Sequence, residues 1–213
     1  MALYGTHIRF ALDVKDYFKV GNLDQYLSGA IYPDSRYFSK IDRHLTHSKE
    51  FKLPDFYQDN DFKKGWSSHV MYDNIQYQLM VEMFGYLLDP EEHKYGSNNW
   101  IIRTTIKILQ DLDDIQQFNF VSFLDCFDYI EVLHNEPLEI VKKYNSSIAA
   151  LYKKIPLGIE DYLELWHSDH MDSEVVNKLK SKFIELEKNK EVMDKVKLIY
   201  PRSLEVFKSE WRG

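Results

Sequence analysis

Two side chains suited to metal chemistry, His69 and Asp73, lie four residues apart in the segment Gly65-Trp66-Ser67-Ser68-His69-Val70-Met71-Tyr72-Asp73. Residues at this spacing lie on one face of a helix, so the imidazole and the carboxylate project from neighbouring turns. Such a pair can share one divalent cation or bind two neighbouring ones. Because the spacing also occurs by chance on solvated helices, the pair needs support from further ligand types nearby.

Further nitrogen and oxygen donors precede this pair within the first third of the chain. They are His7, Asp34 and either His44 or His47. Nitrogen and oxygen donors without thiolates suit zinc, with manganese or iron as alternatives. Taken singly, each histidine has an ordinary structural explanation, either at a helix start or on a polar surface. The sequence therefore offers a candidate divalent-metal site whose members must be brought together by folding.

The segments that carry these residues resemble a known protein family. His7 follows Thr6 at the start of a predicted helix, and His47, preceded by Thr46, comes thirteen residues after Asp34. His69 and Asp73 form an HxxxD pair. This pattern resembles the bacterial zinc-dependent phospholipase C family and the related fungal single-strand nucleases. The segment 26–34 also looks like the leucine-glycine-alanine, proline-aspartate signature of uncharacterised intracellular relatives. The resemblance covers roughly residues 6–80.

The family is all-helical and hydrolyses phosphoesters with up to three zinc ions. The resemblance implies that the metal ligands here are His7, Asp34, His47, His69 and Asp73. His47 fits the family's histidine better than His44 does, both in spacing and in the hydroxyl residue before it.

Two departures from the family pattern reduce the expected number of ions. The secreted enzymes use a processed amino-terminal residue as a ligand, and no processing site is evident. They also have a histidine soon after the HxxxD pair and an HxxxE pair further on, whereas this chain has only His93 in the next loop and a distant HxxxE match at His170 and Glu174. We therefore expect one or two bound ions, with zinc as the favoured metal.

The function implied is hydrolysis of a small-molecule phosphoester by a metal-activated water. A bound cation lowers the pKa of water to about 7 and offsets charge on phosphoryl oxygens. Asp34 or Asp73 is the expected catalytic base. Four cations are candidates to bind the substrate phosphate. They are Arg36, Arg43, Arg103 and Lys107, although a solvated helix face is the commoner explanation of the last two.

Other polar residues have simpler explanations. We expect His134 to contact carbonyls at a helix end, and His167 and His170 to lie in a polar turn. The acidic residues Asp111, Asp113 and Asp114 suggest a solvated turn that could approach a metal site. Cys126, between apolar residues, is expected in the core, since a catalytic thiol favours polar, electropositive surroundings.

The elements that must position these residues are helices throughout. No segment shows sustained alternation of apolar and polar residues, and no long repeat appears. We predict an all-α, single-domain bundle of about nine helices spanning residues 1–213, with a phospholipase C/nuclease-like fold. The expected helices begin at Thr6 as cap and at Asp24, then cover 37–45, 61–87, 100–116, 118–133, 138–152, 159–167 and 173–196, with Pro201 as a break before 204–211. The expected cap of the helix 61–87 is Asp59 or Asp61, and that of the helix 173–196 is Ser173.

Composition excludes several function classes. The 213-residue chain is 44% hydrophobic and 29% charged, which indicates a folded globular protein. Its net charge of −7 argues against binding duplex nucleic acid, which needs a basic surface. No window approaches a membrane span, the start lacks the features of a secretory signal, and the single cysteine cannot pair within the chain, so we expect a cytoplasmic protein.

Two other functions stay open. One is a non-catalytic helical module that binds a protein partner through its acidic surface, with at most a structural metal. The other is a relative of the HD-type phosphohydrolases, which is less favoured because the adjacent His-Asp dipeptide is absent. The oligomeric state is not indicated by the sequence.

Overall fold

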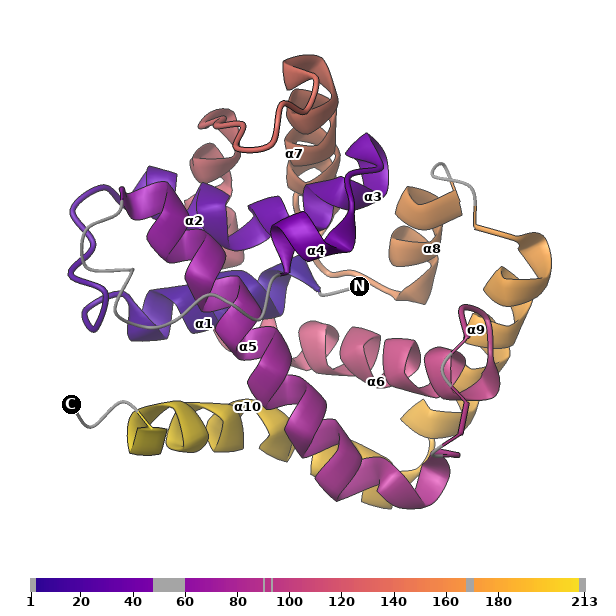
Figure 1. Ribbon diagram of the computed structural model, residues 1–213. Coiled ribbons are helices and arrows are strands. Elements are labelled where there is room, and N and C mark those ends of the chain that lie inside the picture. The colour runs from indigo at the N-terminus through magenta and orange to yellow at the C-terminus, as the bar shows by residue number, and fades with distance from the viewer. Residues whose placement is uncertain (1–2, 48–59, 90, 93, 168–170, 211–213) are drawn as a thin grey trace. The chain divides into compact units, whose positions relative to one another are not determined.

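The computed structural model describes residues 3–47, 60–89, 91–92, 94–167 and 171–210 (Figure 1). Within these ranges the chain is helical and contains no strand, so the all-α prediction is confirmed. The α-helices are α1 (Tyr4–Val14), α2 (Leu23–Ile31), α3 (Arg36–Ser39), α4 (Arg43–Thr46), α5 (Asp61–Phe84), α6 (Asn98–Asp114), α7 (Leu138–Tyr152), α8 (Ile159–His167), α9 (Ser173–Glu187) and α10 (Lys190–Glu210). The 3₁₀ segments are η1 (Tyr32–Ser35), η3 (Gly85–Leu87) and η4 (Phe120–Asp128). No described helix is both long and apolar enough to cross a bilayer.

The described residues group into two compact units. The amino-terminal unit comprises residues 3–72 and 118–156, and the carboxy-terminal unit comprises residues 73–117 and 157–210. Helix α5 contributes its first half to one unit and its second half to the other. The expectation of a single domain stays a prediction.

The amino-terminal unit is built around tyrosines that are both buried and hydrogen-bonded. On α7, the Tyr144 hydroxyl donates to the Ile31 carbonyl at 2.8 Å, which fixes the end of α2. The Tyr152 hydroxyl accepts from the Gly5 backbone N–H at 2.8 Å, which satisfies a donor in the first turn of α1. A buried tyrosine requires such a partner. These bonds attach α7 to the two helices that precede the candidate site.

Helices α2 and α5 approach so closely that neither tolerates a side chain at the contact. A Cβ added to Gly29 would lie 1.9 Å from the Phe62 carbonyl oxygen, and one added to Gly65 would lie 1.8 Å from the Tyr26 carbonyl oxygen. Both distances are well inside van der Waals contact. Glycine is therefore required at both positions, and the two helix backbones pack directly against each other.

The carboxy-terminal unit packs α9 and α10 against α6. Its core contains a polar network: Tyr162 donates to Asp111 at 2.6 Å, and Gln110 donates to Asp114 at 3.2 Å while accepting from Gln76 at 2.7 Å. Asp111 and Asp114 are both buried. The prediction of a solvated acidic turn was thus wrong for these two residues, because Tyr162 of α8 and Gln110 of α6 hydrogen-bond to them in the interior.

Three predicted helix caps differ from those in the structure. Helix α1 begins at Tyr4 without a side-chain cap, so Thr6 lies inside it. Helix α5 is capped by Asn60, whose side chain accepts from the Lys63 N–H at 3.0 Å. Helix α9 is capped by Asp172 in place of Ser173. The predicted alternative cap for α5, Asp59, lies outside the described residues.

Two predicted helices are interrupted. The predicted helix 37–45 is divided into α3 and α4, because Lys40 adopts a left-handed conformation with φ 60° and Asp42 caps a new turn. The predicted helix 118–133 is instead η4, which ends at Asp128, followed by non-helical residues from Tyr129 on. There the carbonyl of Tyr129 accepts from Ser28 at 2.7 Å and that of Phe127 from Asn145 at 3.0 Å. These tertiary hydrogen bonds compete with helix formation.

The prediction of a helix break at Pro201 was wrong, because Pro201 lies inside α10. The break lies before Lys190, where the Asn189 side chain accepts from the Val192 N–H at 3.2 Å and caps α10. Proline removes one backbone donor from a helix interior. Buried residues on both sides of it, including Val196 and Phe207, keep the helix continuous.

Substituting Gly65 with alanine tests the helix contact. We expect Gly65→Ala to lower the free energy of unfolding by about 2–3 kcal/mol, because the added methyl group must push α2 and α5 apart. Urea unfolding monitored by circular dichroism measures the change. Gly85→Ala is the matched control, since a Cβ there meets nothing within 4 Å. Equal stability of the two variants would contradict the close approach.

Asp61 should make the stability of the protein depend on pH. Its carboxylate accepts from the Gly21 N–H at 3.0 Å and from the Lys64 ammonium at 2.7 Å. Burial opposes the charged form, but these hydrogen bonds outweigh burial and lower the pKa of Asp61. The stabilisation is therefore present above the unfolded-state pKa of about 3.9 and is lost as pH falls through the lower folded-state value.

We expect wild-type protein to be more stable than Asp61→Asn at neutral pH, with the difference shrinking below about pH 4. Urea midpoints of both proteins measured between neutral and acid pH provide the test. A difference that is constant over this range would show that the charge of Asp61 does not contribute.

Candidate metal centre

The close approach of α2 and α5 places His69 against the end of α2. Its Nδ1 lies 2.8 Å from the backbone carbonyl oxygen of Ala30, and the side chain is buried. A carbonyl oxygen only accepts, so Nδ1 carries the hydrogen. In the neutral ring the lone pair is then on Nε2, the nitrogen available to a metal ion. A metal-bound histidine commonly has this arrangement, with its other nitrogen hydrogen-bonded to a carbonyl.

His7 lies against the same ring. The two imidazoles are stacked, with centroids 3.8 Å apart and planes within 9°. The edge of Tyr72 packs on His7 at 5.2 Å between centroids. His7 is 2% exposed. Its backbone N–H donates to the Leu3 carbonyl at 3.2 Å, at the start of α1. Packing on two rings therefore fixes the orientation of His7.

Asp34 lies in η1, directly after Pro33, and is 1% exposed. The Nε2 atom of His47 is 3.7 Å from its Oδ1, too far for a hydrogen bond. On the other side of the His47 ring, Nδ1 lies 2.9 Å from the Thr46 hydroxyl oxygen, which in turn lies 3.4 Å from the Arg43 carbonyl. If the hydroxyl donates to that carbonyl, it accepts from Nδ1, and the His47 lone pair on Nε2 faces Asp34.

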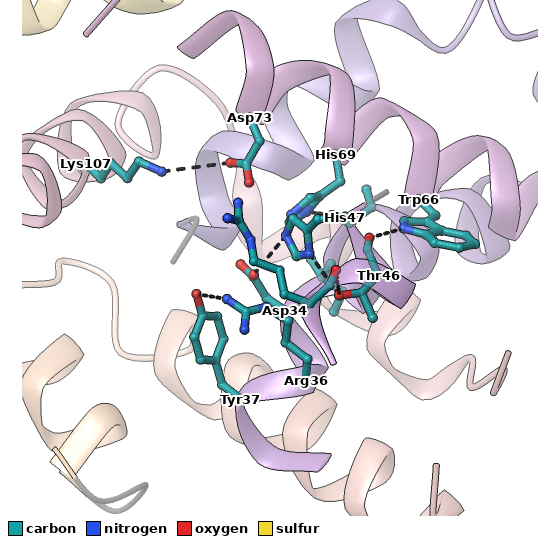
Figure 2. A network of polar contacts seen from close by, with 12 residues as sticks. Asp34, Arg36, Tyr37, Thr46, His47, Trp66, His69, Asp73 and Lys107 are labelled. Atoms are coloured by element: carbon teal, nitrogen blue, oxygen red, sulfur yellow. Dashed lines mark hydrogen bonds and ion pairs between the residues drawn. The ribbon is translucent and has the colours of Figure 1, made fainter. Parts of the chain in front are cut away.

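Trp66 attaches the segment of His47 to α5. Its indole Nε1 donates to the Thr46 carbonyl at 2.6 Å, and its ring packs edge-on against Tyr32 at 6.1 Å between centroids. Tyr32 precedes Asp34 in η1, and Trp66 precedes His69 by one turn of α5. This pair of aromatic residues thus connects the three segments that carry Asp34, His47 and His69. Figure 2 shows the Trp66 indole beside Thr46.

The ligand atoms converge. His7, Asp34 and His69 each offer one atom, and these atoms lie within 4.8 Å of one another, with all three residues buried. Donors around a tetrahedral zinc are about 3.4 Å apart, given bonds of about 2.0–2.2 Å. The nitrogen and oxygen donors therefore fit a divalent ion after small side-chain movements. The structure brings together four of the five predicted ligands, all within the amino-terminal unit.

Asp73 lies one turn beyond His69 on α5 and begins the carboxy-terminal unit. The Lys107 ammonium lies 3.9 Å from its Oδ1. The i, i+4 spacing puts Asp73 on the same helix face as His69. Its roles as fifth ligand and as catalytic base stay predictions.

The four candidate phosphate-binding cations have different surroundings. The Arg36 guanidinium lies over the Tyr37 ring, 4.0 Å from its centroid, whereas Arg43 is exposed. In the carboxy-terminal unit, Arg103 lies 5.1 Å from the centroid of Tyr77, and Lys107 pairs with Asp73. Both of these α6 cations therefore contact α5 side chains within that unit.

Three of the remaining candidates have ordinary structural surroundings, and two lie outside the described residues. His44 is exposed on α4, and its N–H donates to Asp42 at 2.8 Å. His134 packs its ring on Trp66 at 5.5 Å. Cys126 is 1% exposed, and burial raises the pKa of its thiol, which confirms a core position. His93 and His170 lie outside the described residues.

Sequence reasoning missed the Ala30 carbonyl and the Trp66 indole, which orient the ligands. A backbone carbonyl has no residue type to recognise, and Trp66 looks like any core aromatic. The glycines Gly29 and Gly65 were a signal that could have indicated the helix contact. Ala30 follows the first of them, and His69 lies four residues after the second. Comparisons with models of known protein families, with curated proteins and with solved structures found no match to this chain.

Trp66→Phe tests the attachment of the His47 segment. The phenyl ring keeps much of the packing but removes the donor to the Thr46 carbonyl, so we expect a loss of about 1 kcal/mol in the free energy of unfolding. Urea unfolding measures it, with the partly exposed Trp100→Phe as control. An unchanged midpoint in Trp66→Phe would show that this hydrogen bond does not hold the segment.

Proposed function

We propose that this protein is a metal-dependent hydrolase that acts on phosphoesters. The observation that carries the proposal is the convergence of buried ligand atoms from His7, Asp34 and His69, with His47 beside Asp34. The resemblance of these same segments to zinc-dependent phospholipase C and single-strand nucleases supports the reaction class. Zinc is the ion that best suits three imidazoles and a carboxylate, with manganese or iron as alternatives.

The chain's own residues would hold and orient the reacting groups. His69 and His47 would bind through Nε2, because hydrogen bonds to the Ala30 carbonyl and the Thr46 hydroxyl occupy Nδ1. Asp34 would bind through one carboxylate oxygen, leaving the second to accept a proton from water. A divalent ion, when bound, supplies Lewis acidity that makes hydroxide available near neutral pH and offsets phosphoryl charge.

Burial of the cluster has a second role in this proposal. His7, Asp34 and His69 are each no more than 2% exposed, so bulk water has little access to the ligand atoms. Charge interactions are stronger in such surroundings than in bulk water. The substrate phosphate would therefore experience a strong field from the ion once it displaces the remaining solvent.

Metal content and affinity provide the first test. We expect protein purified without chelator to contain about one ion per chain by mass spectrometry. Zinc titration into the metal-free protein should give an affinity that falls at least about 100-fold in His69→Gln and Asp34→Asn, since each removes a direct ligand. His44→Gln is the matched control, because this histidine is exposed on α4. We expect its affinity to match wild type.

Hydrolysis of chromogenic phosphoesters by the metal-loaded protein provides the second test. Turnover should be lost in His69→Gln and retained in His44→Gln. Absence of metal from the native protein, together with no activity after adding zinc or manganese, would contradict the proposal. Tight metal binding without turnover of any phosphoester would instead favour a non-catalytic module with a structural metal.

A further inference from the structure

One cation is held in a fixed orientation two residues after Asp34. The Arg36 guanidinium carbon lies 4.0 Å from the centroid of the Tyr37 ring, and its Nη2 donates to the Tyr37 hydroxyl at 2.5 Å. Stacking on an aromatic face limits the rotation of a guanidinium and leaves its other edges free to donate. Figure 2 shows the guanidinium on the side of the turn where the Asp34 carboxylate lies.

The Arg36 Nε–H is a donor that the described residues do not use. This atom is buried and makes no hydrogen bond to the part of the chain that the structure describes. A buried guanidinium donor without an acceptor is costly, because it has lost its hydration. An oxyanion bound beside Asp34 would supply the missing acceptor, and guanidinium groups match phosphate oxygens well.

The charges around the ligands distinguish between phosphoester classes. A divalent ion bound by Asp34 and by neutral imidazoles alone, without Asp73, would retain one excess positive charge, and Arg36 would add a second. A phosphomonoester carries close to two negative charges at neutral pH, since its second pKa is about 6. A phosphodiester carries only one. The monoester therefore matches the local charge better than the diester does.

Burial favours the same class. The His47 side chain is 6% exposed and that of Asp34 1% exposed. A terminal phosphate can approach a buried ion end-on, with its one substituent directed outward. A diester has substituents on both sides of the phosphorus and needs an open groove across the ligands. A terminal phosphate therefore needs less open space beside this buried cluster than a diester does.

We infer that the preferred substrates are phosphomonoesters and that Arg36 binds their terminal phosphate. This inference rests on the proposed metal-dependent hydrolysis. In the reaction a water oxygen bonds to phosphorus while the bond from phosphorus to the ester oxygen breaks. One proton of the water ends on the ester oxygen, which leaves as an alcohol, and inorganic phosphate is the second product. Arg36 holds two phosphoryl oxygens throughout and exchanges no proton.

Two substrates with the same leaving group separate the classes: p-nitrophenyl phosphate as monoester and methyl p-nitrophenyl phosphate as diester. We expect kcat/KM of the metal-loaded protein to be at least about 10-fold higher for the monoester. Arg36→Gln should lower kcat/KM for the monoester by about 10- to 100-fold, as expected for loss of a charged hydrogen-bonding group, and that for the diester by less. Arg36→Lys, which keeps the charge without the planar group, should restore part of the loss.

Binding of inorganic phosphate to the zinc-loaded protein gives a readout that does not depend on turnover. Calorimetry should show phosphate affinity reduced about 10- to 100-fold in Arg36→Gln while zinc affinity stays within a few-fold of wild type. Lys15→Gln is the control for loss of one positive charge, because the Lys15 side chain is 42% exposed and its ammonium lies 4.0 Å from Asp16 Oδ1. It should leave both affinities unchanged.

The outcomes separate this inference from the proposed function. If the protein binds zinc and hydrolyses the diester as well as the monoester, or if Arg36→Gln affects both substrates equally, the monoester inference fails and the hydrolase proposal stands. If Arg36→Gln tightens zinc binding without weakening phosphate binding, Arg36 only neutralises Asp34, and the inference is again wrong. If the wild-type protein neither binds a metal ion nor hydrolyses either ester, both fail.

Discussion

The direct backbone contact between α2 and α5 is the constraint on which the candidate site depends. Because Gly29 and Gly65 lack side chains, each helix lies against a carbonyl oxygen of the other. The residue after Gly29 then presents its carbonyl to His69, which lies one turn beyond Gly65. A larger residue at either glycine would separate the helices and remove this acceptor. The orientation of a key imidazole thus follows from the absence of two side chains.

A second set of hydrogen bonds orients the imidazole rings of the candidate ligands. A neutral imidazole binds a metal ion through one nitrogen, and a partner on the other nitrogen decides which one. In this protein the partners are the Ala30 carbonyl for His69 and the Thr46 hydroxyl for His47. The Trp66 indole holds Thr46 in turn, so the orientation of His47 depends on α5 as well as on its own short helix.

The sequence predicted the helical class and the residues of the cluster better than the limits of the helices. Residue types and spacing are local, so His7, Asp34 and His69 could be picked out as candidates from the sequence, whereas the choice of His47 over His44 came from the family resemblance. Helix ends in this chain are decided by distant groups, as where Ser28 and Asn145 bind the carbonyls that a helix after Phe120 would need. The buried carboxylate of Asp111 was missed for the same reason, because its partner Tyr162 lies on another helix.

The burial and orientation of the cluster are what the proposed cation site would need. A carboxylate that is 1% exposed, as Asp34 is, has lost its hydration, and the nearby Nε2 of His47 lies 3.7 Å from its Oδ1. Three imidazoles around it have Nδ1 or ring-face contacts that fix their orientation, which a purely apolar core would not require. A divalent ion would offset the carboxylate charge and accept the nitrogen lone pairs at once. If the proposed site binds an ion, the burial of Asp34 and of the imidazoles would contribute to the affinity.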